Sequence, residues 1–188
     1  MKIHRTPLAD LMLIETAPIR DERGQFVRVF CETQCAEFRP GLHWVQINVS
    51  STLHKGTVRG MHFQYPPAAE AKLIRCLKGR VFDVAVDLRA DSPTFLRWHG
   101  VELSEDESMQ FFIPEGFAHG FQALTDDAQL LYLHTAAWNR QHEGALRHDD
   151  SALSIAWPLA VTQVSEKDRS TPLMDEHFAG INLNEFQS

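Results

Sequence analysis

The chain has 188 residues, 44% of them hydrophobic, and a formal net charge of −7 at pH 7. This length suits one domain of ordinary size with a substantial core. The negative charge argues against a general nucleic-acid or membrane binder, although converging cations can still bind an anionic ligand.

The cysteine content and the distribution of apolar residues indicate a cellular compartment. Cys31, Cys35 and Cys76 are odd in number and form no Cys-x-x-Cys pair. The sequence has neither the apolar segment of a signal peptide nor an apolar run long enough to cross a membrane. We therefore expect a cytoplasmic protein with free thiols and without a membrane or nucleic-acid partner.

The N-terminal part predicts short strands and one helix. Residues 1–19 are typical of one or two edge strands, with Pro7 and Pro18 as interruptions. A turn at 21–24 leads into a strand at 25–30. A short helix is predicted at 32–38, before Pro40-Gly41.

Residues 44–50 predict a strand because polar and aliphatic side chains alternate there. We expect the aliphatic face to pack as the outside of a sheet. The polar face either meets solvent or lines a polar cavity. The aliphatic face consists of Val45, Ile47 and Val49, and the polar face of Trp44, Gln46, Asn48 and Ser50.

Strand candidates recur roughly every 8–12 residues through the rest of the chain, separated by Gly, Pro and Asp signals. This pattern predicts an all-β sandwich or barrel with few helices. After Trp157-Pro158 it weakens into a tail of loops and short helical turns. The further candidates are 58–63, 72–77, 80–88, 95–103, 109–113, 120–124 and 129–135.

The segment from Thr57 to Lys72 contains a possible acid/base site. Arg59 could hold an anion, His62 could accept a proton, and Lys72 supplies a second cation. Arg59 and His62 have odd spacing and would face opposite sides of a regular strand, but a bulge at Gly60 would realign them. Taken alone, these residues also fit ordinary solvated or core positions.

A turn at Pro114-Glu-Gly116 opens onto a strand that carries His119. This resembles the second motif of the cupin barrels, in which a Pro-x-Gly-x-x-His run supplies a metal ligand. The first cupin motif normally gives His-x-His and then a glutamate. Here the corresponding run is His62-Phe-Gln64 and Glu70 lies too far along, so the donor set is poor for zinc or iron. We expect no metal.

Two later features fit either a functional or an ordinary structural role. Tyr132 is one of only two tyrosines and lies on a late predicted strand. Its phenol could serve as an acid inside a barrel, but a packed tyrosine with a wet hydroxyl fits equally well. Residues 165–169 form a charge run that is, by itself, typical of a solvated surface.

Together with further short motifs, these segments occur in an order that closely resembles the dTDP-4-dehydrorhamnose 3,5-epimerase family, over roughly residues 5–175. The Arg-Gly-Met-His and Gly-Phe-Ala-His-Gly-Phe runs are the most specific. The motifs are Asp21-x-Arg-Gly-x-Phe26, Gln46-x-Asn-x-Ser50, Val58-Arg-Gly-Met-His62, Ala71-Lys72-Leu, Phe82-Asp-Val-x-Val-Asp-Leu-Arg89, Ser92-Pro-Thr-Phe95, Ile113-Pro-Glu-Gly-Phe-Ala-His-Gly-Phe121, Asp149-Asp, Trp157-Pro and Ser165-x-Lys-Asp168.

The resemblance implies a metal-free cupin jelly roll, a double-stranded β-helix with a few short helices, that works as a homodimer. Residues 1–188 are expected to form a single domain whose last 30 or so residues contribute to the site. The implied reaction converts dTDP-4-dehydro-6-deoxy-D-glucose to dTDP-4-dehydro-L-rhamnose by inversion at C3 and C5, without a cofactor. The substrate class is a nucleotide-linked 4-keto-6-deoxyhexose.

The motif matches imply His62 as the base, Asp168 as its partner, Tyr132 as the acid on the opposite face and Lys72 near the keto oxygen. Both reacting hydrogens are α to the ketone, so their removal gives an enolate whose oxygen a cation stabilises. Inversion needs the new proton to arrive from the other face. The implied contacts to substrate or nucleotide are Arg23, Gln46, Asn48, Arg59, His119, Trp138, Glu143 and Lys167.

Two positions depart from the family pattern. Arg28 replaces the usual glutamate on the nucleotide side, which leads us to hypothesise a changed nucleobase preference. Trp138 replaces a usual tyrosine of the active-site wall, which could change whether both carbons invert. A 3- or 5-mono-epimerase is therefore the alternative within the class. A metal-dependent cupin oxygenase or isomerase and a non-catalytic sugar-nucleotide binder are the alternatives from other classes.

Overall fold

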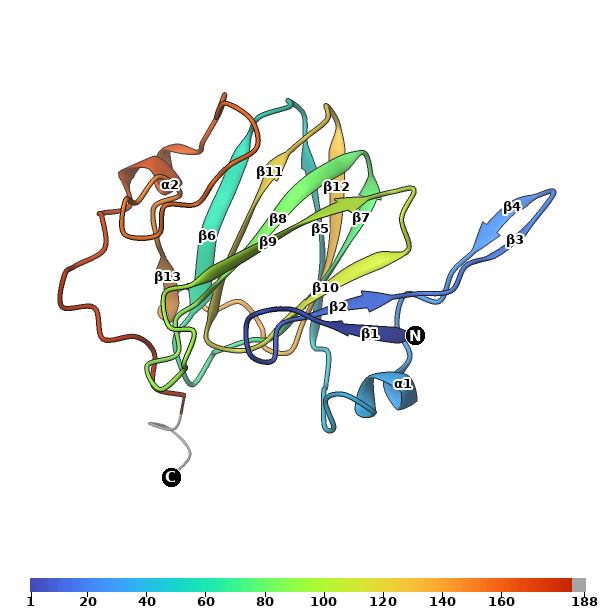
Figure 1. Cartoon of the computed structure of the whole chain (residues 1–188), viewed down its shortest axis with the longest axis horizontal. Helices are drawn as coiled ribbons and strands as arrows, with labels where there is room; N and C mark the ends of the chain where they lie inside the picture. The colour runs from blue at the N-terminus through green and yellow to red at the C-terminus, as the bar shows by residue number, and fades with distance from the viewer. Residues whose placement is uncertain (184–188) are drawn as a thin grey trace.

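Two antiparallel β-sheets face each other in the computed structural model, which describes residues 1–183 (Figure 1). One sheet has six strands in the order β1-β2-β10-β7-β12-β5, and the other has five in the order β13-β6-β11-β8-β9. A separate hairpin, β3-β4, extends away from this body (Figure 1). The predicted domain runs to residue 188, and residues 184–188 lie outside the described range.

The elements are short. The strands are β1 (Lys2–Arg5), β2 (Met12–Glu15), β3 (Ile19–Asp21), β4 (Gly24–Phe26), β5 (Gln46–Thr52), β6 (Val58–Gln64), β7 (Lys72–Lys78), β8 (Arg80–Asp87), β9 (Trp98–Ser104), β10 (Met109–Ile113), β11 (Phe117–Ala123), β12 (Ala128–His134) and β13 (Glu143–Ala145). The helices are α1 (Glu32–Ala36) and α2 (Glu166–Ser170). Among the described residues, no helix is long and apolar enough to cross a membrane.

Apolar side chains from both sheets fill part of the space between them. Phe111 on β10 and Leu130 on β12 meet Phe117 and Phe121 on β11 in one buried cluster. The alternation of β8 divides its side chains between two clusters, with Ala85 in this core and Val84 beneath the C-terminal tail. The period of two that predicts strands therefore also separates the inner and outer faces of the sheet.

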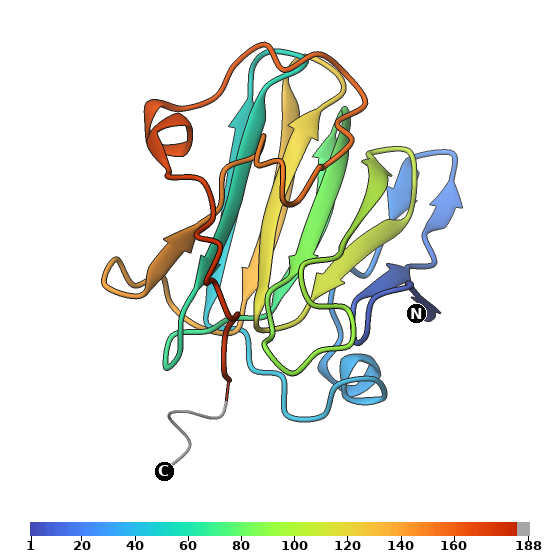
Figure 2. The same cartoon turned by 60° about the vertical axis from the view of Figure 1, so that its left-hand side comes forward.

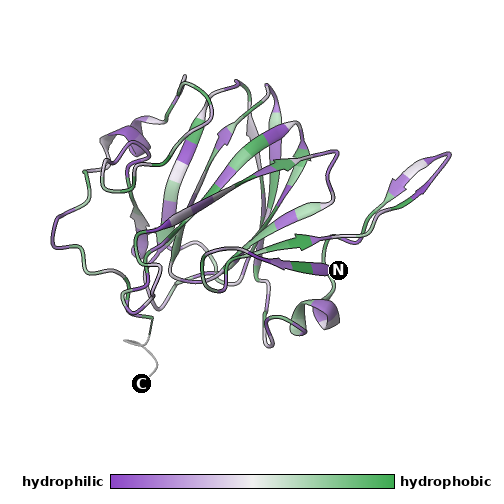
Figure 3. Cartoon of the chain, viewed as in Figure 1, coloured by the Kyte–Doolittle hydropathy of each residue, from purple (hydrophilic) through white to green (hydrophobic). Residues whose placement is uncertain are grey.

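The C-terminal tail covers the outer face of the five-stranded sheet (Figure 2). Leu146, Leu153 and Trp157 pack there against side chains of β6 and β8. Colouring by hydropathy shows mixed character along most strands and a largely hydrophilic α2 (Figure 3). The tail is thus anchored by apolar contacts, while α2 carries polar side chains.

The predicted all-β class is confirmed, and nearly every expected strand is present within a few residues of its expected limits. The expected strand at 25–30 is shorter than predicted, because pairing in this hairpin ends at Phe26. Strand β13 was not predicted, since three residues are too few to give a periodic signal.

One packing expectation is wrong. Within the chain, this aliphatic face is not covered: Val45, just before β5, and Ile47 and Val49 on β5 are 50%, 63% and 58% exposed. Strand β5 is the edge strand of the six-stranded sheet, and the described residues leave this face of it mostly exposed. Of the polar face, Asn48 and Ser50 line a cavity, as one of the two expectations had it, whereas Trp44 and Gln46 do not.

The predicted irregularity in β6 is present. His62 pairs with His119 of β11 and Arg59 pairs with Phe121, so three steps along β6 match two steps along β11. Gly60 has a φ of +129°, and a Cβ atom there would lie 2.5 Å from the Cα of Gly120. The bulge allows Arg59 and His62 to line the same cavity.

Gly60→Ala tests this close approach against a matched control. Gly24 has nearly the same φ, +128°, but nothing within 4 Å of its would-be Cβ. We expect Gly24→Ala to lower the free energy of unfolding by about 1 kcal/mol, and Gly60→Ala by about 2 kcal/mol more, because overpacking is added to the backbone cost. Chemical denaturation measures both. Equal losses would show that the contact with β11 imposes no constraint.

Candidate active site

A cavity of about 660 Å³ opens between the two sheets. Its walls come from β5, β7 and β12 of one sheet and β6 and β11 of the other, with β13 and α2 at the side. All predicted site residues except Arg23 and Gln46 line it. These lining residues are Asn48, Arg59, His62, Lys72, His119, Tyr132, Trp138, Glu143, Lys167 and Asp168.

His62 and Asp168 form a hydrogen-bonded pair, although they lie 106 positions apart in the sequence. The Nε2 of His62 lies 2.7 Å from Oδ1 of Asp168. Asp168 is buried, whereas the His62 ring is 36% exposed to the cavity. Because Nε2 donates to the carboxylate, Nδ1 of His62 is the nitrogen that can accept a proton; it has no hydrogen bond to any described residue.

Two hydrogen bonds position Asp168, one within the tail and one from β6. Ser165 caps α2 by accepting a hydrogen bond from the N–H of Asp168 at 3.0 Å. The N–H of Gly60 donates to Oδ2 of Asp168 at 3.4 Å. Burial acts to raise the pKa of Asp168, but the hydrogen bond and charge of His62, with the Gly60 N–H, hold that pKa below its ordinary value.

Lys72 is buried in the wall formed by β7. Its Nζ lies 3.2 Å from Oε1 of Glu70 and donates to the carbonyl oxygen of His62 at 3.3 Å. The other carboxylate oxygen of Glu70 lies 2.9 Å from Nδ1 of His134. A charged cluster thus stands in the wall beside the His62–Asp168 pair.

Tyr132 enters the cavity from β12, on the sheet opposite His62. Its hydroxyl lies 3.0 Å from Oγ of Ser50. Burial raises the pKa of Tyr132, so the phenol keeps its proton at neutral pH. The position can therefore supply a proton donor opposite the histidine.

His119 lies on β11 and forms part of the cavity wall. Its Nε2 is 2.8 Å from Oδ1 of Asp83, and both side chains are buried. Burial lowers the pKa of His119, and the partly compensating charge and hydrogen bond of Asp83 do not reverse that shift. His119 is therefore a neutral ring fixed in orientation, with its second nitrogen remaining for a ligand.

Cationic side chains gather near the opening. Arg59 donates from Nε to Oγ1 of Thr52 at 3.0 Å, and Lys167 of α2 pairs with Glu143 of β13 at 2.7 Å. Trp138 is 57% exposed and also lines the cavity. The opening thus offers positive charge and an aromatic surface.

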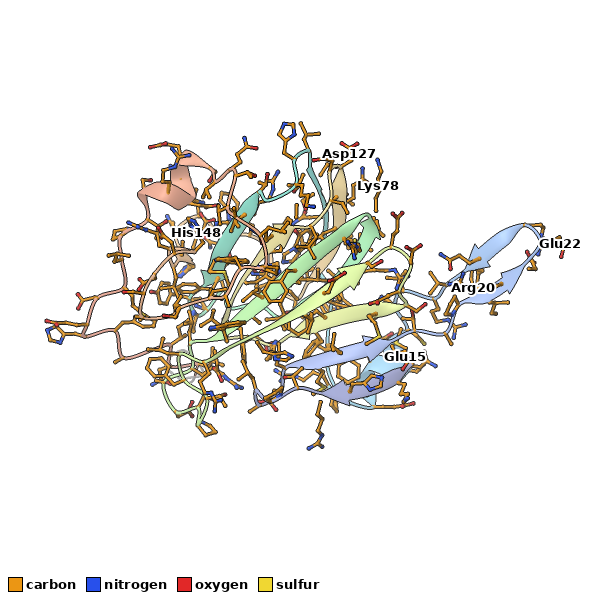
Figure 4. All side chains as sticks on the ribbon, turned by 45° about the horizontal axis from the view of Figure 1, so that its top comes forward. Glu15, Arg20, Glu22, Lys78, Asp127 and His148 are labelled. Carbon is orange, nitrogen blue, oxygen red and sulfur yellow. The ribbon has the colours of Figure 1, made fainter. Side chains whose placement is uncertain are left out.

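Three residues that the sequence places on the substrate or nucleotide side lie outside the cavity lining. Gln46 accepts a hydrogen bond from the backbone N–H of Trp138 at 3.0 Å and so supports the wall. Arg23 lies on the hairpin, where it pairs with Asp21. Arg28 is exposed after β4, so the hypothesis about the nucleobase stays a prediction. Figure 4 shows Arg20 and Glu22 of the same hairpin projecting away from the body.

Sequence reasoning missed Glu70 and His134 as parts of this site. Each lies two positions from a predicted residue, Lys72 or Tyr132, so the two-residue period could have placed them on the same side. No group of three or more His, Cys, Asp or Glu side chains that could hold a metal ion occurs within residues 1–183.

Comparisons with known proteins agree on one family. The profile of the family described as dTDP-4-dehydrorhamnose 3,5-epimerase matches residues 5–176. The enzyme of that name from Sinorhizobium fredii is 43% identical, over 90% of this chain and 87% of its own. The predicted family is confirmed, and with it the cupin-type jelly roll.

Solved structures give the same result. The dTDP-4-dehydrorhamnose 3,5-epimerase of Bacillus anthracis, with TDP and PPi bound, has a TM-score of 0.89 and 38% identity, covering 92% of this chain and 99% of that one. The dTDP-6-deoxy-D-glucose-3,5-epimerase of Legionella pneumophila, in complex with dTDP-4-keto-L-rhamnose, has a TM-score of 0.87 and 40% identity, covering 92% of each chain.

The pKa shifts of the two tyrosines predict a spectroscopic result. Burial raises the pKa of both Tyr65 and Tyr132 above the ordinary value of 10.0. At pH 10, where an unperturbed tyrosine is half ionised, the folded protein should show less phenolate absorbance than the unfolded one. Tyr132→Phe should leave that weak signal unchanged at pH 10. A signal at pH 10 that Tyr132→Phe removes would contradict a protonated Tyr132.

Proposed function

Because the chain belongs to the dTDP-4-dehydrorhamnose 3,5-epimerase family, we propose that it inverts C3 and C5 of dTDP-4-dehydro-6-deoxy-D-glucose to give dTDP-4-dehydro-L-rhamnose. The observation that carries this proposal is the placement of His62, Tyr132 and Lys72 around one cavity, on β6, β12 and β7. A base and an acid on opposite walls suit a reaction in which a proton leaves one face of a sugar ring and another arrives at the opposite face.

In the first proposed step, Nδ1 of His62 takes the proton from the carbon next to the C4 ketone. The electrons of the broken C–H bond form the enolate, and its charge develops on the C4 oxygen. The ammonium of Lys72 stabilises that oxygen. The carboxylate of Asp168 accepts the Nε2 proton, which fixes the ring tautomer that leaves Nδ1 as the acceptor, and it stabilises the imidazolium that forms.

In the second proposed step, the phenol of Tyr132 protonates the carbon from the opposite face. One inversion leaves a proton on His62 and a negative charge on Tyr132. Exchange with solvent returns both groups to their starting states before the second carbon reacts. Proton exchange with solvent is therefore built into the cycle, and deuterium from D2O should enter the product.

The opening suits the nucleotide diphosphate of the substrate. Arg59 and Lys167 supply positive charge there, in a chain whose overall charge is negative. Guanidinium groups bind phosphate oxygens through pairs of parallel hydrogen bonds. We propose that these two residues hold the diphosphate while the sugar extends inward to His62.

The decisive experiment is incubation of the enzyme with dTDP-4-dehydro-6-deoxy-D-glucose in D2O, followed by NMR of the product. We expect deuterium and inverted configuration at both C3 and C5. His62→Ala should lower the rate of exchange by about 10²–10⁴-fold, because it removes the base. Tyr132→Phe should allow exchange but not inversion.

Other outcomes would contradict the proposal in different ways. Deuterium at only one carbon would identify a mono-epimerase. The exposed Trp138 would then be the first residue to examine as its cause. Exchange at neither carbon would exclude this substrate. Normal inversion by Tyr132→Phe would show that another group is the acid.

We further propose that the enzyme works as a homodimer whose interface includes the uncovered aliphatic face of β5. Ile47 and Val49 are 63% and 58% exposed on this edge strand. Arg23 lies on the β3-β4 hairpin, which extends away from the two sheets (Figure 1). We propose that it contributes its guanidinium to the nucleotide site of the partner subunit.

Mixing two inactive variants tests this exchange of Arg23. Arg23→Ala should have weak substrate affinity, and His62→Ala should lack the base. In a mixed dimer, the cavity of the first variant keeps His62 and receives Arg23 from the second, so activity should rise well above either variant alone. No recovery in dimers that have demonstrably exchanged subunits would show that Arg23 does not act across the interface.

A further inference from the structure

Glu70, Lys72 and His134 form a buried cluster in the cavity wall, and the steps proposed above use only Lys72. The three side chains are 9%, 8% and 10% exposed. Glu70 binds Lys72 with one carboxylate oxygen, at 3.2 Å, and His134 with the other, at 2.9 Å. Burying a carboxylate costs free energy that only its partners can offset, and carboxylates are rarely buried. The burial of Glu70 with two partners therefore needs a reason.

Glu70 is ionised in this position. Burial acts to raise its pKa, but the hydrogen bond from His134 and the charge of Lys72 outweigh burial and hold that pKa below its ordinary value. The carboxylate thus accepts from two donors at once. A glutamine could not replace it in full, because an amide has only one acceptor oxygen.

His134 connects Glu70 to the opposite part of the wall. The Nδ2 of Asn48 donates to Nε2 of His134 at 3.2 Å, so the ring proton is on Nδ1 and points to Glu70. The ring of His134 also stacks near that of Tyr132, with 18° between the planes and 6.0 Å between the centroids. A chain of hydrogen bonds therefore runs from Asn48 through His134 and Glu70 to Lys72.

Lys72 has three N–H donors on a flexible stem. One points to Glu70 and one to the carbonyl oxygen of His62. The third remains for a ligand in the cavity that Lys72 lines. Two fixed hydrogen bonds therefore set the direction in which the ammonium can meet an enolate oxygen.

Resting on the function proposed above, we propose that Glu70 is the positioning residue of Lys72, and that His134 fixes Glu70 and the Asn48 amide. Neither residue exchanges a proton with substrate in this scheme. The negative charge of Glu70 weakens the positive potential of Lys72, so its contribution must come from direction. Precise orientation of a catalytic group can be worth orders of magnitude in rate.

The test is a double-mutant cycle of Glu70→Gln and Lys72→Met, with kcat and KM measured on dTDP-4-dehydro-6-deoxy-D-glucose. Glu70→Gln should lower kcat about 10-fold and change KM less than about 3-fold. In the Lys72→Met background, the same substitution should cause no further loss of kcat. Such non-additivity is expected when one residue acts through the other.

Controls separate positioning from general damage. Glu115→Gln also removes a carboxylate from an ion pair, with Arg39, but away from the cavity lining, and should leave kcat unchanged. The affinity of Glu70→Gln for dTDP should stay close to that of the wild type, although its melting temperature should fall because the buried Lys72 loses its ion-pair partner. If Glu70→Gln does not fold, His134→Gln replaces it in the cycle, with an expected loss of roughly 3-fold that is again absent in the Lys72→Met background.

Two results would overturn the positioning role of Glu70 and leave the proposed function untouched. One is unchanged kcat for Glu70→Gln in an active enzyme. The other is an equal loss with and without Lys72, which would indicate a structural role. Failure of the wild type to turn over the substrate would instead overturn the proposed function, and the inference with it.

Discussion

Most polar side chains buried around the cavity have a hydrogen-bond partner, and this pairing organises the cavity. Leaving a buried polar group without a partner would cost more free energy than the packing around it contributes. Here the partners form short chains that cross from one element to another, so each pairing also fixes an orientation. The pairs are His62 with Asp168, His119 with Asp83, Tyr132 with Ser50, and Glu70 with both Lys72 and His134.

The apolar core makes this polar region possible. Phe111, Phe121 and their neighbours hold the sheets together beside the cavity, and the tail packs its own apolar side chains on the outer face of the five-stranded sheet. That packing brings α2 to the bulge of β6, where Asp168 meets His62 and the N–H of Gly60. The position of a catalytic carboxylate candidate thus depends on hydrophobic contacts made by other residues of the tail.

The sequence was sufficient for the strands because a period of two is local and is repeated in nearly every one of them. It also showed which face of β5 is polar and where β6 must be irregular. It could not show that Asp168 meets His62, since 106 positions separate them and only the docking of the tail decides the contact. The motif resemblance supplied that pairing.

The exposure of one face of β5 and the role of Glu70 could not be predicted from local sequence patterns, for two different reasons. The aliphatic face of β5 has the alternation of a packed strand, yet alternation does not say whether the covering surface belongs to the same chain. Glu70 lies before its strand and was weighed only as a metal ligand. Its role as a shared acceptor follows from the positions of Lys72 and His134, which the fold alone brings together.

The two-sheet architecture also bears on the stereochemistry of the proposed reaction. His62 belongs to one sheet and Tyr132 to the other, so a ring held between the sheets presents one face to each. The hydrogen bond from Nε2 to Asp168 leaves Nδ1 of His62 as the basic nitrogen, and the raised pKa of Tyr132 keeps its proton available. A base whose accepting nitrogen is fixed by its tautomer and an acid that starts protonated, on opposite walls, favour inversion over return of the proton to the same face. The direction of proton transfer in the proposed cycle is therefore set by the environments of these two groups before substrate arrives.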